Sequence, residues 1–219
     1  MRFSHQVSLC AAMLAVASAA QASSIDIFFG RITNNNVQNP GSQFKAVLSD
    51  VSGQPNKVTF TFTNNVGIAS SISEIYYDDR APLQLLTLQT PLTQVGCNFT
   101  PGGANPGNLP GGNVLSPAFN AVQAFSADAQ GNPSEGIDTA ADSLTMTFTL
   151  QGGASFATVV NAISNGTLRI GLHVRAIGTQ GGSDSFVNGN FVPVPPAAMA
   201  GGALMAGLLG IGAIRRRRA

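Results

Sequence analysis

The stretch Val58-Thr-Phe-Thr-Phe-Thr63 alternates apolar and polar residues without a break. Successive side chains of an extended chain point to opposite faces, so Val58, Phe60 and Phe62 share one face and the three threonines share the other. β-Branched and aromatic residues at this spacing are typical of a strand with one buried face. The sequence therefore predicts a sheet that packs on a hydrophobic core from one side.

The same alternation returns in the second half of the chain. Leu144-Thr-Met-Thr-Phe-Thr-Leu150 places its apolar residues on one face and its threonines on the other. In the segment 168–177 we expect Leu168, Ile170, Leu172 and Val174 to point inward and Arg169, His173 and Arg175 to point outward to solvent. Shorter strands are predicted at residues 25–29, 43–48, 72–77, 83–88 and 184–187.

A single short helix interrupts these strands. Residues 156–164 carry apolar side chains at i, i+3, i+4 and i+7, Ser155 is placed as the N-cap, and Gly166 is placed as the stop. Many short strands with Gly and Asn turns and one helix favour an antiparallel β-sandwich with a jelly-roll-like or Greek-key layout. The sequence does not determine the strand order.

The middle of the chain has no periodic pattern. Eight of the twelve residues from Pro101 to Gly112 are Pro or Gly, which removes backbone donors and adds conformational freedom. Strand patterns on both sides of this segment are alike. We therefore expect a long surface excursion of one domain, not a boundary between two.

The charge distribution and the cysteine content limit the possible function. Between residues 23 and 192 there are six basic and ten acidic residues, a formal charge of −4 without a basic patch, which argues against nucleic acid as a partner. Cys10 lies in the N-terminal apolar stretch, so Cys97 is the only cysteine expected in the processed chain. We expect Cys97 to be a partly buried bystander, with intermolecular pairing or catalysis as the alternatives.

Residues 1–22 have the three parts of a secretory signal peptide. Arg2 and His5 lie in a short polar start, an apolar stretch covers residues 7–17, and Ala20-Gln21-Ala22 is a small-residue exit. A predominantly apolar stretch of eleven residues is too short for a bilayer core that needs about 20. The pattern predicts export by the Sec machinery and cleavage by signal peptidase after Ala22, with Ala20 and Ala22 as the recognised residues.

The C-terminal segment also has three parts. A short motif, Val192-Pro193-Val194-Pro195-Pro196, precedes 18 uncharged residues at 197–214 and the cluster Arg215, Arg216, Arg217 and Arg218. Eighteen helical residues reach ~27 Å, which is sufficient for a bilayer core. The positive-inside rule keeps the arginine cluster in the cytoplasm, so the sequence predicts a transmembrane helix with residues 23–191 outside.

The signal peptide, proline motif, transmembrane helix and arginine cluster together resemble the PEP-CTERM proteins, which are exosortase substrates of Gram-negative bacteria that make exopolysaccharide. The resemblance implies an inner-membrane precursor that an exosortase-like enzyme cuts near the motif, and a product at the cell surface or in the extracellular matrix. The family usually has Glu where this chain has Val194. The motif is closer to a Val-Pro-Leu-Pro variant, which leaves open the subtype of enzyme that recognises it.

The densest polar cluster surrounds two tyrosines. Glu74 lies in the predicted strand 72–77, and Asp78 and Asp79 directly follow Tyr77 at its end. Carboxylate oxygens there suit Ca²⁺, and no other cofactor is expected. The alternative is a solvated strand end with Arg80 as counter-ion. Tyr76 and Tyr77 suggest a second hypothesis, a carbohydrate-binding module in which these rings stack on sugars.

No residue constellation specifies a reaction. A glycosidase needs two carboxylates facing each other, and none of the ten acids lies in a recognisable motif. A Ser/His/Asp triad would have to use His173, which is predicted to face solvent. We therefore predict a non-catalytic surface protein, with signal peptide 1–22, β-domain 23–191 and sorting signal 192–219. A third hypothesis is a single-pass membrane protein whose tail is never removed.

Overall fold

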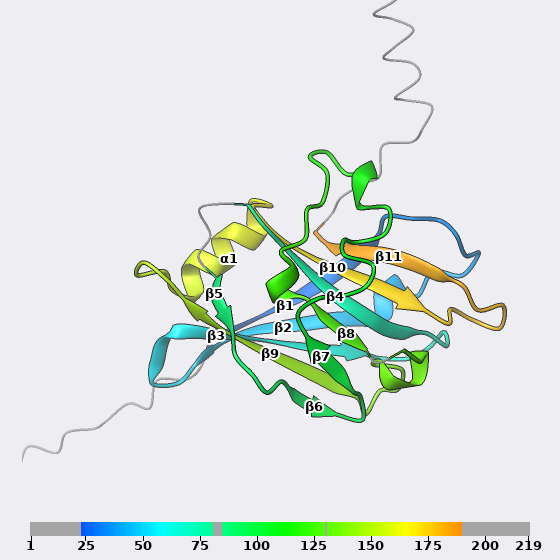
Figure 1. Ribbon diagram of the computed structural model, residues 1–219, viewed down its shortest axis with the longest axis horizontal. Helices are drawn as coiled ribbons and strands as arrows, with labels where there is room; N and C mark the ends of the chain where they lie inside the picture. Colours follow the sequence, from blue (N-terminus) through cyan, green and yellow to red (C-terminus); the bar gives the residue numbers. More distant parts are fainter. Residues whose placement is uncertain (1–22, 81–84, 130, 190–219) are drawn as a thin grey trace, which may run out of the picture.

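The computed structural model describes residues 23–80, 85–129 and 131–189 (Figure 1). These residues form a mainly antiparallel β-structure with one α-helix, which confirms the predicted class. The strands are β1 (Ser24–Arg31), β2 (Phe44–Val51), β3 (Gln54–Asn64), β4 (Ser71–Asp79), β5 (Leu85–Leu88), β6 (Thr93–Val95), β7 (Phe99–Pro101), β8 (Ala127–Ala129), β9 (Ser143–Leu150), β10 (Leu168–Arg175) and β11 (Ser183–Asn188). The helix is α1 (Phe156–Ser164), with the predicted limits.

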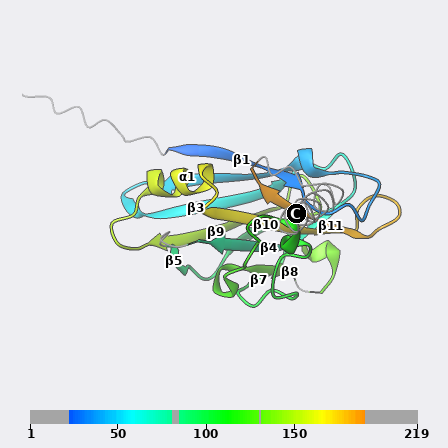
Figure 2. The same ribbon diagram turned by 90° about the horizontal axis from the view of Figure 1, so that it is seen from above.

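All strands belong to one continuous sheet with the order β5-β9-β3-β2-β1-β11-β10-β4-β8-β7, and β6 pairs with β9 beside β5. The continuity depends on β1. Residues 24–28 of β1 pair with β2, and residues 29–31 pair with β11. The sheet is therefore barrel-like, with two halves that face each other and are joined through one strand. Figure 2 shows the body side on, with β1 at one side and β7 and β8 at the other.

The hydrophobic core lies between the two halves. The predicted inward residues of β3 and β9, including Phe60 and Phe148, are fully or almost fully buried there. Phe60 contacts Tyr77 of β4 at a ring-centroid distance of 5.3 Å, so the halves meet through aromatic side chains. Helix α1 covers one end of this core through Val159 and Ala162. The backbone N–H of Ser155 donates to the Thr158 hydroxyl at 3.1 Å, which supports the predicted start of the helix.

The proline- and glycine-rich excursion has a defined place. We call residues 102–122 the strap. It lies over the outer face of β4, β10 and β11 and leads into a short 3₁₀ helix at Gln123–Phe125 (Figure 1). Its apolar side chains form a second buried cluster with the sheet, whose members are Ile32, Tyr76, Ala104, Leu109, Leu115, Phe119 and Val187. Half of the sheet is therefore covered on both faces.

No helix within the described ranges is long and apolar enough to cross a bilayer. The transmembrane helix expected at residues 197–214 lies outside those ranges. So do the signal peptide, with Ala20 and Ala22, the motif Val192–Pro196 and the cluster Arg215–Arg218.

Candidate functional site

The residues that the sequence singled out lie on β4, between β10 and β8. Period two places Glu74, Tyr76 and Asp78 on the outer face and Ile75 and Tyr77 on the core face. Eight of the nine residues of β4 are buried, because the strap covers the outer face. The alternative of a solvated strand end is therefore wrong for Glu74 and Asp78, although Arg80 is a counter-ion of Asp78, as that alternative predicted.

Both tyrosine rings are inaccessible. Tyr77 lies in the core, where its hydroxyl donates to Met146 Sδ at 3.8 Å. Tyr76 lies under the strap and donates to the Pro106 carbonyl oxygen at 2.9 Å. Burial is the main cause that raises the pKa of both hydroxyls, and the charge of Glu74 adds to the effect on the pKa of Tyr76. The hypothesis that these two rings stack on sugars is wrong, since neither presents a face to solvent.

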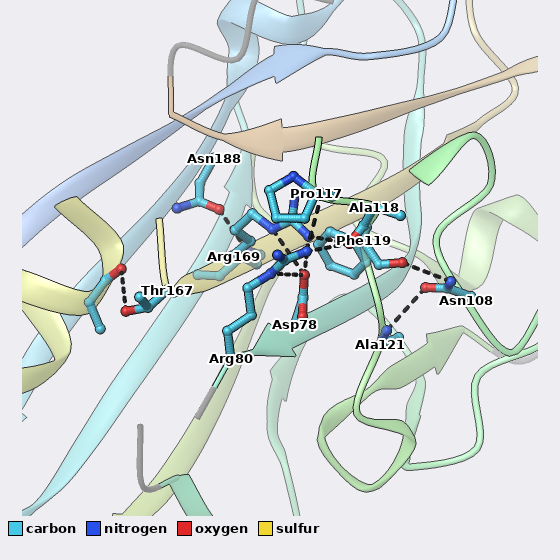
Figure 3. Close-up of polar contacts among 12 residues, drawn as sticks. Asp78, Arg80, Asn108, Pro117, Ala118, Phe119, Ala121, Thr167, Arg169 and Asn188 are labelled. Atoms are coloured by element: carbon cyan, nitrogen blue, oxygen red, sulfur yellow. Dashed lines mark hydrogen bonds and ion pairs between the residues drawn. The ribbon is translucent and has the colours of Figure 1, made fainter. Parts of the chain in front are cut away.

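Asp78 is held by two arginines. Arg169 of β10 donates to Asp78 Oδ2 from Nε at 2.9 Å and also from Nη2, and Arg80 Nε donates to the same oxygen at 3.2 Å (Figure 3). Arg169 was expected to point to solvent but is only 1% exposed. The alternation predicted its face correctly; the strap then covers that face.

The same guanidinium binds the strap. Arg169 Nη1 donates to the Pro117 carbonyl at 2.8 Å, Nη2 donates to the Ala118 carbonyl at 2.7 Å, and the group lies 5.2 Å from the ring centroid of Phe119 (Figure 3). Five donors in a rigid fork allow one arginine to satisfy a carboxylate and two carbonyls together. Arg169 is therefore the link between β4, β10 and the strap.

Glu74 forms a second polar group at the other end of the strap. His173 Nδ1 lies 2.6 Å from Glu74 Oε2, and Arg175 Nη1 lies 3.7 Å from Glu74 Oε1. Asp128 of β8 is the cross-strand neighbour of Glu74 and accepts from the backbone N–H of Asn105 in the strap at 3.2 Å. This group fixes the start of the strap, as the Asp78 group fixes its end.

The four residues of the predicted ligand cluster are not brought together. Glu74 and Asp78 share a face but are four strand positions apart, about 13 Å. Tyr77 and Asp79 lie on the opposite face of β4. Across residues 23–80, 85–129 and 131–189, no three His, Cys, Asp or Glu side chains converge in a way that could hold a metal ion. The carboxylates of Glu74 and Asp78 are engaged with basic side chains of the fold.

The glycine in the middle of β10 is a sequence feature that indicates the close approach of the strap. Gly171 lies in the middle of β10, and a Cβ atom there would lie 2.8 Å from Leu109 Cδ2 and 3.1 Å from Phe119 Cζ. A glycine inside a strand often marks the close approach of another segment. Together with Leu109 and Phe119 in an otherwise Pro- and Gly-rich stretch, it indicated that this face is covered.

The thiol of Cys97 is half-buried and donates to the Ser143 carbonyl oxygen at 3.3 Å. Burial is the main cause that raises its pKa to about 11. At neutral pH the group is therefore a protonated thiol and a poor nucleophile, which agrees with the expectation of a bystander.

Replacing Asp128 by Asn should raise the free energy of unfolding at pH 7. Burial, with the nearby charge of Glu74, raises the pKa of Asp128 in the folded state. A raised pKa favours the protonated carboxyl, so the stability that Asp128 contributes is present at acid pH and is lost as the pH rises through the raised pKa. The gain of Asp128→Asn should shrink below the ordinary Asp pKa of about 3.9. Urea unfolding of the parent and of Asp128→Asn, at pH 7 and again below about pH 3.9, measures the difference in the free energy of unfolding.

The matched control is Asp26→Asn, since Asp26 is exposed and lies 3.3 Å from Lys45 Nζ. This change should not stabilise the protein at pH 7. A variant Asp128→Asn that is less stable than the parent at pH 7 would contradict the electrostatic argument.

A comparison of this chain with protein-family models, curated protein sequences and solved structures finds no match in any of the three.

Proposed function

We propose that the chain is the precursor of a non-catalytic exported protein, sorted by an exosortase-like membrane enzyme and retained with the exopolysaccharide or biofilm matrix of a Gram-negative bacterium. The observation that carries this proposal is the three-part segment 192–219, in which a proline motif, an uncharged stretch and four arginines follow one another. Each part has its own role: recognition, membrane insertion and retention of the C-terminus in the cytoplasm.

The β-domain supports the proposal in two ways. It builds its core from two facing half-sheets without a disulfide between described residues, so its folding does not depend on oxidation after export. The acidic side chains that first suggested ligand chemistry have partners within the fold: Asp78 pairs with Arg169, which also binds the strap, and Glu74 lies 3.7 Å from Arg175. Both observations support a stable β-domain that the sorting segment carries out of the cell.

The proposal includes the finer description of the fold. The aromatic contacts between β3 and β4 favour a sandwich in which two antiparallel layers pack face to face. We also propose that the precursor is held in the inner membrane by residues 197–214, with the β-domain outside and Arg215–Arg218 in the cytoplasm, before the product reaches the surface or the matrix.

Intact-mass analysis of the protein isolated from its host tests the proposal. We expect a product that begins at Ser23 and ends near Val192–Pro196, without Arg215–Arg218. Replacing the four arginines by Ser should leave unprocessed precursor in the membrane fraction, because the cytoplasmic retention signal is lost. The control Lys57→Ser changes the charge of the domain and should leave processing intact. A product that begins at Ser23 and still carries the arginines would instead support the permanently anchored protein.

A further inference from the structure

The outer face of the other half of the sheet carries an unusual side chain. Phe28 of β1 is 61% exposed and is the only aromatic residue among the large hydrophobic side chains that the described part of the chain leaves exposed. It borders a depression of about 400 Å³ that is also lined by Ser42, Lys45, Thr63 and Asn65. We call these five side chains the Phe28 face. An aromatic ring beside hydroxyl, amide and amino groups is a combination suited to a ligand.

The sheet register places these side chains in a row. Phe28 is the cross-strand neighbour of Lys45, and Lys45 is the neighbour of Thr63 on the other side. Cross-strand neighbours share a face of the sheet and lie ~5 Å apart at their Cβ atoms. The row therefore crosses β1, β2 and β3 with an aromatic ring at one end and a hydroxyl at the other.

The surface continues from this row as a field of hydroxyl groups. β3 lies next to β2, and β9 lies next to β3. Their outward residues include six threonines, namely Thr59, Thr61 and Thr63 of β3 and Thr145, Thr147 and Thr149 of β9. Lys45 Nζ lies 3.3 Å from Asp26 Oδ2, so its charge is offset on the same face. The face thus offers hydrogen-bonding groups and methyl groups with little net charge.

A buried polar network fixes the floor of the depression. Gln43 Nε2 donates to Asn64 Oδ1 at 2.9 Å, and Gln43 Oε1 accepts from the backbone N–H groups of Gly67 and Ile68. Asn64 Nδ2 donates to the Ser70 carbonyl at 2.9 Å. Both amides are held by several partners, so the backbone next to Thr63 and Asn65 is already ordered before a ligand arrives. Such preorganisation lowers the entropy cost of binding.

We propose that the Phe28 face binds an uncharged polysaccharide. The ring of Phe28 covers the C–H face of a sugar, since the negative face of an aromatic ring attracts the weakly positive C–H groups. Thr63, Asn65, Ser42 and Lys45 donate to or accept from the sugar hydroxyls. The absence of net charge favours a neutral chain over an acidic one. The inference deepens the proposed function, because an exported matrix protein is the one that meets such a chain.

A protein partner fits this face less well. Protein interfaces concentrate several aromatic or large apolar residues at a desolvated centre and are depleted in Ser and Lys. Here one aromatic ring is surrounded by hydroxyl, amide and amino groups. A second copy of the chain would place two such hydroxyl-rich faces against each other, which leaves few apolar contacts to stabilise a dimer.

Native gel electrophoresis of the full chain in detergent, in gels that contain hydroxyethylcellulose, galactomannan, dextran or the acidic polymer alginate, tests the proposal. We expect at least one neutral polymer to retard the protein. Phe28→Ala should weaken that binding about ten-fold or more, and Phe28→Trp should preserve it. The control Val114→Ala removes an exposed apolar side chain from the strap and should leave retardation unchanged. Unchanged circular dichroism shows that the variants are folded.

The chain's two lysines give an independent measurement in one sample. Lys45 lies in the Phe28 face, whereas Lys57 lies on β3 about 20 Å along the strand from Thr63. A polymer that retards the protein should protect Lys45 from amine acylation and leave Lys57 reactive, as peptide mass spectrometry shows.

Several results would overturn the proposal: no retardation by any neutral polymer, retardation by alginate alone, equal retardation of Phe28→Ala, or equal protection of both lysines. A dimer in sedimentation experiments that Phe28→Ala abolishes, without retardation, would assign the face to a second copy instead. These results are separate from the sorting test. A retained C-terminal tail would refute sorting and leave the gel result unchanged, and a failed gel test would leave the intact mass unchanged.

Discussion

Replacing Arg169 by Ala should lower the free energy of unfolding by about 3–5 kcal/mol, because it leaves a buried carboxylate without its main partner. Arg169 is 1% exposed and Asp78 is 2% exposed, so bulk solvent screens this ion pair little. The substitution also removes the donors to the Pro117 and Ala118 carbonyls and the packing on Phe119. Urea unfolding followed by circular dichroism measures the loss.

The matched control is Arg175→Ala on the same strand. Its side chain is one-third exposed and lies 3.7 Å from Glu74 Oε1. A solvent-screened pair of this kind is expected to contribute less than about 1 kcal/mol. An equal loss for Arg169 and Arg175 would contradict the assignment of Arg169 as the link to the strap.

A double variant separates the packing of Arg169 from its charge. Arg169→Met with Asp78→Leu replaces the buried ion pair by apolar side chains, and such replacements are often close to neutral. We expect it to be more stable than Arg169→Ala alone, since no unpaired carboxylate remains. A double variant as unstable as the single one would show that the carbonyl contacts with Pro117 and Ala118 dominate.

The strands that could be predicted are those whose two faces differ. In β3 and β9 one face meets the core and the other meets solvent, so alternation is complete and both strands lie where expected. Helix α1 was predictable for the same reason, through its apolar stripe. The order in which the strands pair could not be predicted, because β1 changes partner from β2 to β11 after Phe28, and nothing local in its sequence requires this change.

In the candidate site, alternation predicts which face of the strand carries a side chain but not whether that face is exposed to solvent. Alternation assigned Arg169 and His173 to the outer face of β10, which is correct. The further prediction that side chains on the outer face are exposed to solvent is wrong, because the strap, which has no periodic pattern, covers that face. Phe28 is the opposite case: an aromatic residue on an outer face that the described part of the chain leaves open. Whether an outer face is covered depends on tertiary contacts, which a local pattern does not contain.

Phe148→Ala should lower the free energy of unfolding by about 3–5 kcal/mol, the usual cost of truncating a buried Phe. Its ring lies 4.9 Å from Tyr77, 5.8 Å from Phe60 and 5.6 Å from Phe125 by centroid distance. These contacts join β9 to both half-sheets and to the 3₁₀ helix after the strap. The cavity left by truncation would therefore open at the point where the halves meet, and little local collapse can fill it.

Thr147→Ala is the control. Thr147 directly precedes Phe148 in β9, but its side chain lies on the outer face and is only partly buried. It should change stability by no more than about 0.5 kcal/mol. Tyr77→Phe keeps the ring and removes only a weak 3.8 Å contact to Met146 Sδ, so its cost should also be small. A double-mutant cycle with Phe148→Ala and Tyr77→Ala should show a coupling of about 0.5–1.5 kcal/mol for the ring pair. Additive losses would show that the rings stabilise the two halves independently and do not join them.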